Sequence, residues 1–95
     1  MEDILNLING ALVPAAGGTW IDDHEPATGR VYARIADSDE RDVAASVKAA
    51  QDAFPTWLGM GREGRSQVLH RLADLIEQDL EAFARAESRD NGKPV

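Results

Sequence analysis

The chain has no cysteine, few aromatic residues and a deficit of basic charge. Without cysteine, the sequence excludes disulfide bonds, thiolate metal sites and cysteine nucleophiles within these 95 residues. A formal net charge of −7 disfavours binding to a phosphate backbone, and no stripe of lysine and arginine offsets this charge locally. No long apolar run is present, so we predict neither a signal peptide nor a membrane span. We therefore expect a cytoplasmic protein that binds neither nucleic acid nor membrane.

The material for a hydrophobic core is limited. The composition is 43% apolar, but alanine supplies much of this share and aromatic residues make up only 5% of the chain. Chains this short also hide a smaller fraction of their surface than longer chains. We therefore expect limited stability in isolation, or a core that is completed by further sequence.

The first part of the chain has the pattern of short strands joined by turns. Asn9-Gly10 separates two apolar runs and favours a two-residue hairpin turn. Alternation of apolar residues further along predicts a half-buried strand. In chain order we expect strands over 5–8, 11–13, 19–21 and 31–36, with a loop of small residues over 14–18 and a turn over 26–29.

From Asp39 onward the apolar period changes to that of a helix, and Asp39 is the predicted N-cap. Pro55 and the glycines that follow are predicted to end this helix and to open a link that contains Trp57. A second helix is predicted over 62–78, and a third over 80–91 is either separate from it or fused to it with a kink. The chain thus divides into a strand and hairpin segment and a helical segment. The predicted ranges are 1–38 and 39–95.

The last residues close the third predicted helix. Asn91 and Gly92 suit the left-handed conformation that ends a helix, and Pro94 prevents the helix from resuming. A chain seldom ends on such a connector, so we expect that more sequence follows it.

An acidic cluster is the densest group of polar residues in the chain. It consists of Asp22, Asp23, His24 and Glu25, and oxygen ligands bunched in a loop can hold a hard cation. The simpler interpretation is a solvated acidic turn, because the spacing matches no EF-hand loop. The other histidine, His70, lies too far along the sequence to predict a metal site, and we expect it on a helix surface.

Motifs that would carry catalysis or phosphate binding are missing. Gly92-Lys93 lacks both the earlier glycine and the following serine or threonine of a phosphate-binding loop. The sequence contains no GxGxxG and no GxSxG motif. We therefore predict no catalytic residue and no cofactor-binding residue in this chain.

The second and third predicted helices share a broad apolar surface. Two interpretations remain open, an intramolecular core, which we favour, and a partner-binding face. The residues concerned are Val68, Leu69, Leu72, Ile76, Leu80 and Phe83.

Six segments, taken in order, resemble the N-terminal portion of an NAD(P)-dependent aldehyde dehydrogenase. Each motif alone is weak, but six in the same order and spacing are specific, and they span residues 5–95. They lie at 7–10, 25–31, 42–50, 53–57, 65–77 and 87–94. Residues 31–34 and 86–90 are most similar to the branch that oxidises aminomuconic or hydroxymuconic semialdehydes. One departure is Glu25, where the family usually has asparagine. Asparagine both donates and accepts hydrogen bonds, whereas ionised glutamate only accepts them, so we expect the hydrogen bonding of the following turn to differ.

The resemblance implies an α/β parent with a Rossmann-type cofactor domain, a catalytic domain and an oligomerisation element, of which this chain is the N-terminal piece. Such enzymes use a cysteine thiolate, a general-base glutamate and NAD or NADP to oxidise an aldehyde to a carboxylic acid. In the family pattern these catalytic groups lie beyond this sequence. We therefore expect a catalytically silent, structural fragment, and a parent that is a homodimer or homotetramer.

Some family members also bind a structural monovalent cation, through backbone carbonyls before the turn at 26–29 and the aspartate of the Asp-Asn-Gly-Lys-Pro motif. Carried over by position, the ligands are Asp23, His24 and Asp90, and the ion is Na⁺ or K⁺. An alternative from another class of function is a free-standing, non-enzymatic module whose helical face binds a partner or self-associates.

Overall fold

Five short strands occupy the first part of the chain, in a computed structural model that describes residues 1–95. The outer strand β1 runs parallel to the central strand β5, and β4 pairs with the other edge of β5 in antiparallel orientation. A separate antiparallel hairpin is formed by β2 and β3. The strands are β1 (Glu2–Ile4), β2 (Asn6–Ile8), β3 (Ala11–Val13), β4 (Trp20–Glu25) and β5 (Arg30–Ala36).

The two predicted turns are confirmed. Asn9 and Gly10 both adopt positive φ, at 52° and 76°, as a two-residue hairpin turn requires. Gly29 also has positive φ, at 70°, and its N–H donates to the carbonyl of Glu25 at 2.7 Å. These conformations are dictated locally, which is why the sequence predicts them.

Strand β1 was not predicted, because its three residues carry no alternating pattern of their own. It is held on β5 by Arg34, whose Nε lies 2.6 Å from Oδ1 of Asp3. The same guanidinium lies 4.1 Å from the ring centroid of Trp20 on β4. The hydrogen bond from Arg34 lowers the pKa of Asp3, so this carboxyl stays ionised at lower pH than an ordinary aspartate.

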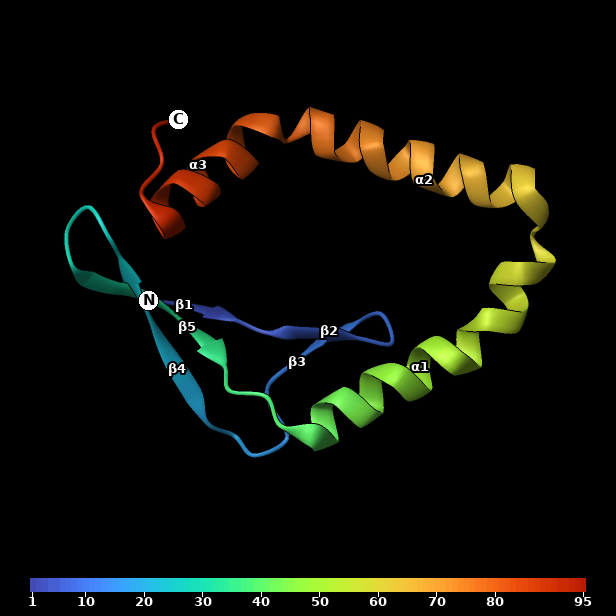
Figure 1. Ribbon diagram of the computed structural model, residues 1–95, viewed down its shortest axis with the longest axis horizontal. Helices are drawn as coiled ribbons and strands as arrows, with labels where there is room; N and C mark the ends of the chain where they lie inside the picture. The colour runs from blue at the N-terminus through green and yellow to red at the C-terminus, as the bar shows by residue number, and fades with distance from the viewer.

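Three helices follow the strands and form an arc whose two ends meet the strand region (Figure 1). Asp39 is the N-cap of the first helix, as predicted, and its side chain accepts a hydrogen bond from the N–H of Arg41 at 2.8 Å. At the other end of the arc, Gly92 closes the last helix with φ of 82°, and its N–H donates to Ser88 O at 2.9 Å. The helices are α1 (Glu40–Gly59), α2 (Gly61–Gln78) and α3 (Leu80–Asn91).

The prediction that Pro55 ends the first helix is wrong. Helix α1 continues through Pro55 to Gly59, so Trp57 lies in its last turn and not in a link. A proline removes one N–H donor, but the helix continues for four residues beyond it and closes where the N–H of Met60 donates to Thr56 O at 3.2 Å. Gly61, with φ of 77°, then makes the turn into α2.

Helices α2 and α3 are separate, which decides between the two alternatives left open by the sequence. Asp79 interrupts them with φ of −106° and ψ of 21°, outside the helical region. Its own N–H still donates to Leu75 O at 3.3 Å, so the break is a change of direction within a nearly continuous helical path.

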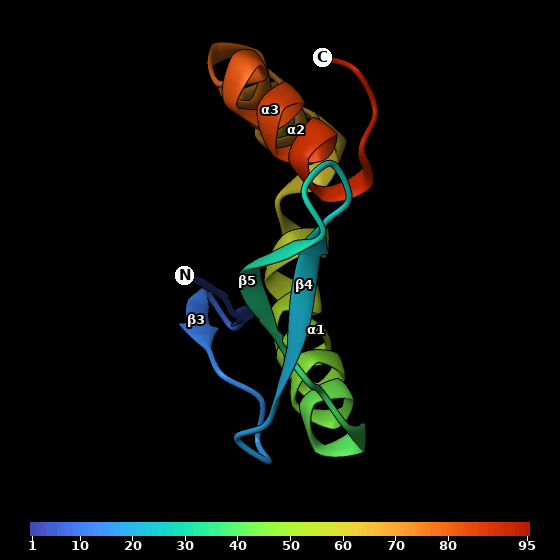
Figure 2. The same cartoon turned by 90° about the vertical axis from the view of Figure 1, so that its left-hand side faces the viewer.

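The strands and helices together enclose almost no hydrophobic core. Only Ala15, Ala33 and Asp42 are buried, and the radius of gyration is 16.7 Å. A compact domain of this length would have a radius of gyration of about 12 Å. Seen edge-on in Figure 2, the molecule is thin, and its smallest extent is 16 Å. The arrangement is a flat, open frame.

The apolar surface of α2 and α3 is therefore uncovered, and the prediction of an intramolecular core is wrong within residues 1–95. Leu72 is 52% exposed and Phe83 is 53% exposed. Large apolar side chains of α1 are uncovered in the same way, as at Phe54, which is 57% exposed. None of the three helices has the length and apolar character of a membrane span.

Candidate functional site

The simpler interpretation of the acidic cluster as a solvated turn is wrong. Asp22 to Glu25 are the last four residues of strand β4, and Asp22 pairs with Arg34 while Asp23 pairs with Ala33. A run of acidic residues is a poor strand former in isolation, so pairing with β5 determines its conformation. A bulge between Asp23 and His24 then shifts the register.

Two of the three predicted cation ligands, Asp23 and Asp90, come together where α3 meets the sheet. The hydroxyl of Tyr32 donates to Oδ1 of Asp90 at 2.9 Å. A hydrogen bond with Asp90 raises the pKa of the Asp23 carboxyl, and desolvation raises it further. Desolvation and the hydrogen bond to Asp90 also raise the pKa of Tyr32. The neighbouring Asp90 carboxyl therefore opposes ionisation of Asp23.

The third predicted ligand, His24, is exposed. No group of three or more His, Cys, Asp and Glu side chains is arranged to hold a metal ion. Two adjacent carboxyls suit a cation, but the side chains alone do not complete a coordination shell. The monovalent cation at Asp23, His24 and Asp90 stays a prediction.

Arg89 and Glu25 connect the same two elements. Nε of Arg89 lies 3.1 Å from Oε1 of Glu25, and the guanidinium lies 4.3 Å from the ring centroid of Tyr32. The second oxygen of Glu25 accepts a hydrogen bond from Oγ1 of Thr28 at 2.9 Å. Sequence reasoning missed Tyr32 and Arg89, and the unusual Glu25 was the one signal that pointed to this contact.

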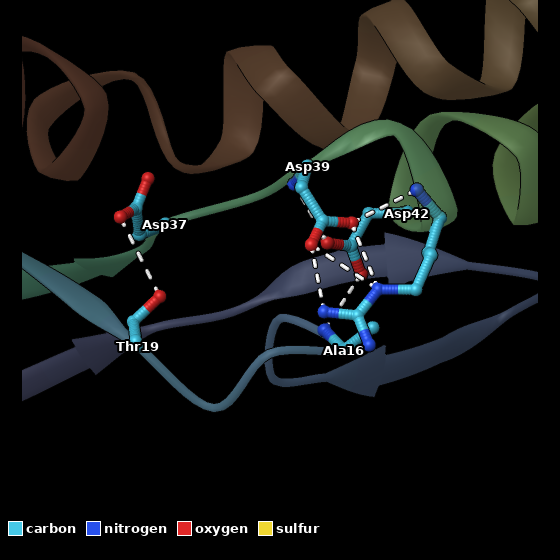
Figure 3. A network of polar contacts seen from close by, with 6 residues as sticks. Ala16, Thr19, Asp37, Asp39 and Asp42 are labelled. Carbon is cyan, nitrogen blue, oxygen red and sulfur yellow. Dashed lines mark hydrogen bonds and ion pairs between the residues drawn. The ribbon is translucent and has the colours of Figure 1, made fainter.

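Asp42 organises the opposite end of the frame (Figure 3). It is only 7% exposed, and its two oxygens accept from the N–H of Ala16 at 2.9 Å and the N–H of Asp39 at 3.0 Å. Hydrogen bonds from Arg41 lower the pKa of Asp39. The loop before β4 and the start of α1 are therefore joined through one buried carboxylate.

The chain offers no groups from which cofactor chemistry can be derived. The glycines with positive φ lie in turns and at helix ends, and none stands between a strand and a following helix, where a glycine-rich loop holds phosphates. His70 is exposed on α2, as predicted, and lines a shallow, open pocket with Arg62 and Arg65.

The comparisons with known proteins agree with the arrangement of strands and helices. The model of the aldehyde dehydrogenase family matches residues 12–95. This chain belongs to the aldehyde dehydrogenase family. It is 47% identical over 90 residues to human 2-aminomuconic semialdehyde dehydrogenase, covering 95% of this chain and 18% of that protein. It is 40% identical over 95 residues to 2-hydroxymuconic semialdehyde dehydrogenase of Pseudomonas sp. strain CF600, covering 99% of this chain and 20% of that protein.

Solved aldehyde dehydrogenases contain the same frame. The NAD⁺ complex of the aldehyde dehydrogenase from Bacillus cereus matches with a TM-score of 0.93 and 42% identity, over 98% of this chain and 19% of that one. The family resemblance and the α/β fold are thereby confirmed, with this chain corresponding to the N-terminal region. The chain spans about a fifth of the length of these relatives.

Proposed function

We propose that this chain is the N-terminal frame of an NAD(P)-dependent aldehyde dehydrogenase that oxidises a muconic semialdehyde, or a similar aldehyde, to a carboxylic acid. The observation that carries the proposal is the 40–47% identity to enzymes named for such substrates, along nearly the whole chain. NAD is the favoured cofactor, since a closely matching structure is an NAD⁺ complex. The complete enzyme is a cytoplasmic homodimer or homotetramer in this proposal.

The contribution of these residues to the reaction is structural. The chain has no cysteine to attack an aldehyde, and its buried carboxylate, Asp42, is occupied by two backbone N–H groups. Its apolar helix faces are uncovered, and its radius of gyration of 16.7 Å exceeds that of a compact domain. The partner that suits such a frame is the remainder of the aldehyde dehydrogenase polypeptide, packed against the apolar faces.

A chimera tests this proposal. The matched residues of human 2-aminomuconic semialdehyde dehydrogenase are replaced by this chain, and NAD-dependent oxidation of the semialdehyde is measured. We expect the chimera to be soluble and active. A chimera that assembles like the human enzyme but does not oxidise the substrate would contradict the proposal.

A pair of variants in the chimera tests the role of the apolar face. Leu72→Glu places a charge on this face and is expected to abolish soluble assembly, because an unpaired charge is costly to bury. Gln67→Glu introduces the same charge five residues earlier on α2, on a different face of the helix, and is expected to be tolerated. Equal behaviour of the two variants would instead favour the free-standing module, as would a compact, non-aggregating monomer of the isolated chain in sedimentation.

A further inference from the structure

The chain contains two Asn-Gly dipeptides, and both stand where the backbone turns. Asn9-Gly10 forms the tip of the β2–β3 hairpin, and Asn91-Gly92 ends α3. A glycine after asparagine leaves its backbone nitrogen unshielded by a Cβ atom, so this nitrogen can approach the asparagine side chain. The third asparagine, Asn6, precedes a leucine and lacks this feature. The same reactive pair thus occurs in two environments that can be compared.

At the end of α3, both ends of the Asn91 side chain are held by hydrogen bonds. Its Oδ1 accepts from the N–H of Lys93 at 2.8 Å, and its Nδ2 donates to Oε1 of Glu87 at 2.6 Å. The N–H of Gly92 donates to Ser88 O at 2.9 Å, which turns this nitrogen towards the helix. All three bonds join residues no more than four positions apart, so they do not depend on what covers the apolar faces.

None of these restraints is present at the hairpin. The Asn9 side chain makes no hydrogen bond within the chain, and the N–H of Gly10 donates to no acceptor. A Cβ atom built at Gly10 would meet nothing within 4 Å, whereas one built at Gly92 would lie 3.4 Å from Cβ of Pro26. The hairpin itself has only three residue pairs, and two-stranded hairpins have little stability of their own. Asn9-Gly10 therefore has the freedom that the second dipeptide lacks.

We propose that Asn9 is a site of spontaneous deamidation in the folded protein and that Asn91 is protected from the same reaction. The nitrogen of Gly10 forms a bond to Cγ of Asn9 while the bond from Cγ to Nδ2 breaks. Ammonia leaves with the hydrogen of the Gly10 nitrogen, and a cyclic imide remains. Water then opens the imide at either carbonyl, which yields aspartate or isoaspartate at this position.

The two products affect the hairpin differently. Isoaspartate carries the chain through its side chain and adds one methylene group to the backbone. The two-residue turn between Ile8 and Ala11 fits the paired strands only at the natural backbone length, so isoaspartate is expected to disturb the pairing of Leu7 with Leu12. Aspartate keeps the backbone length and adds one negative charge to a chain of net charge −7.

Peptide mass spectrometry measures both sites in one sample. The chain is incubated in mildly alkaline buffer, with and without denaturant, and is then digested with trypsin. Trypsin places Asn9 in the peptide 1–30 and Asn91 in the peptide 90–95. Asn9→Gln should remove nearly all deamidation from the first peptide, which excludes Asn6 as its source. Isoaspartate is identified by enzymatic methylation with a labelled methyl donor, and the measurement is repeated in the chimera.

We expect Asn9 to deamidate at least about tenfold faster than Asn91 in the folded chain, since three hydrogen bonds must break before Asn91 reacts. Denaturant should make the two rates nearly equal, because both dipeptides consist of the same residues. Glu87→Ala removes one of the three bonds and should accelerate Asn91 without changing Asn9. Glu81→Ala is the matched control, because Glu81 pairs with Arg85 at 3.1 Å within α3.

Equal rates at Asn9 and Asn91 in the folded chain would overturn the proposal. An Asn9 that reacts no faster than Asn91 in the chimera would do the same. So would a rate at Asn91 that denaturant leaves unchanged, since the hydrogen bonds would then give no protection. The proposal does not rest on the proposed enzyme function, and no dehydrogenase activity is measured, so its failure is distinct from failure of that function.

Discussion

Replacing Asp42 with alanine is expected to release two backbone amides at once. The carboxylate accepts from the N–H of Ala16 with one oxygen and from the N–H of Asp39 with the other, at 2.9 and 3.0 Å. A hydrogen bond to a charged group contributes about 1.5–3 kcal/mol, and a factor of ten corresponds to about 1.4 kcal/mol. Each amide should therefore exchange its hydrogen with solvent about 10 to 100 times faster in Asp42→Ala.

The isosteric variant Asp42→Asn keeps the shape of the side chain but removes its charge and one of its two acceptor oxygens. Its side chain has one oxygen and one NH₂ group, so it can accept from only one of the two amides, and the other faces a donor. We expect one of the amides of Ala16 and Asp39 to keep its protection while the other loses it.

Amide exchange followed by NMR measures both sites directly. Asp52→Asn is the matched control, since Asp52 pairs with Lys48 at 3.0 Å on the exposed side of α1 and its loss should leave Ala16 unchanged. The reasoning is refuted if both amides stay protected in Asp42→Ala, or if Asp52→Asn deprotects Ala16 equally.

Two further predictions concern α1 and the carboxyl pair. Pro55→Ala should stabilise α1 by up to about 3 kcal/mol, because alanine restores an N–H donor within an exposed helix, and a lower melting temperature would contradict this. Asp90→Ala should weaken the thermal stabilisation of the complete enzyme by Na⁺ or K⁺, and an unchanged response to both salts would remove Asp90 from the cation site.

Features fixed by one or two neighbouring residues were predictable from the sequence. The turn at Asn9-Gly10, the N-cap at Asp39 and the helix end at Gly92 each depend on a backbone conformation or a short hydrogen bond that the local residues favour. The helices were also predictable, because an apolar period of 3.6 is a property of the segment itself.

Features that depend on distant pairing were not predictable in this way. The acidic residues Asp22 to Glu25 are extended because β5 pairs with them, and β1 is a strand because it pairs with the other edge of β5, where Arg34 also binds Asp3. Propensity predicts the opposite for both segments, since acidic runs favour loops. Pro55 was misjudged for a different reason, because one missing N–H donor did not stop the helix from continuing to Gly59.

The candidate site was only partly accessible from sequence. The meeting of Asp23 and Asp90 followed from the family resemblance, and the structure brings these two together. Tyr32 and Arg89 lie in segments that carry the family resemblance, but their contact with each other appears only when the end of α3 lies on the β4–β5 turn. The departure at Glu25 was visible, but its partner, 64 positions away, was not.

The difference between local patterns and distant partners also explains why the apolar helix faces predict a core that the chain does not contain. Apolar periodicity predicts that a helix face packs against something, but it does not identify the partner. Here no other part of the chain covers Leu72 or Phe83. The frame keeps its shape through polar junctions at Asp42 and Arg89. Substitutions at these junctions should therefore alter the isolated chain, whereas substitutions on the apolar faces should act only once the remaining enzyme is packed against them.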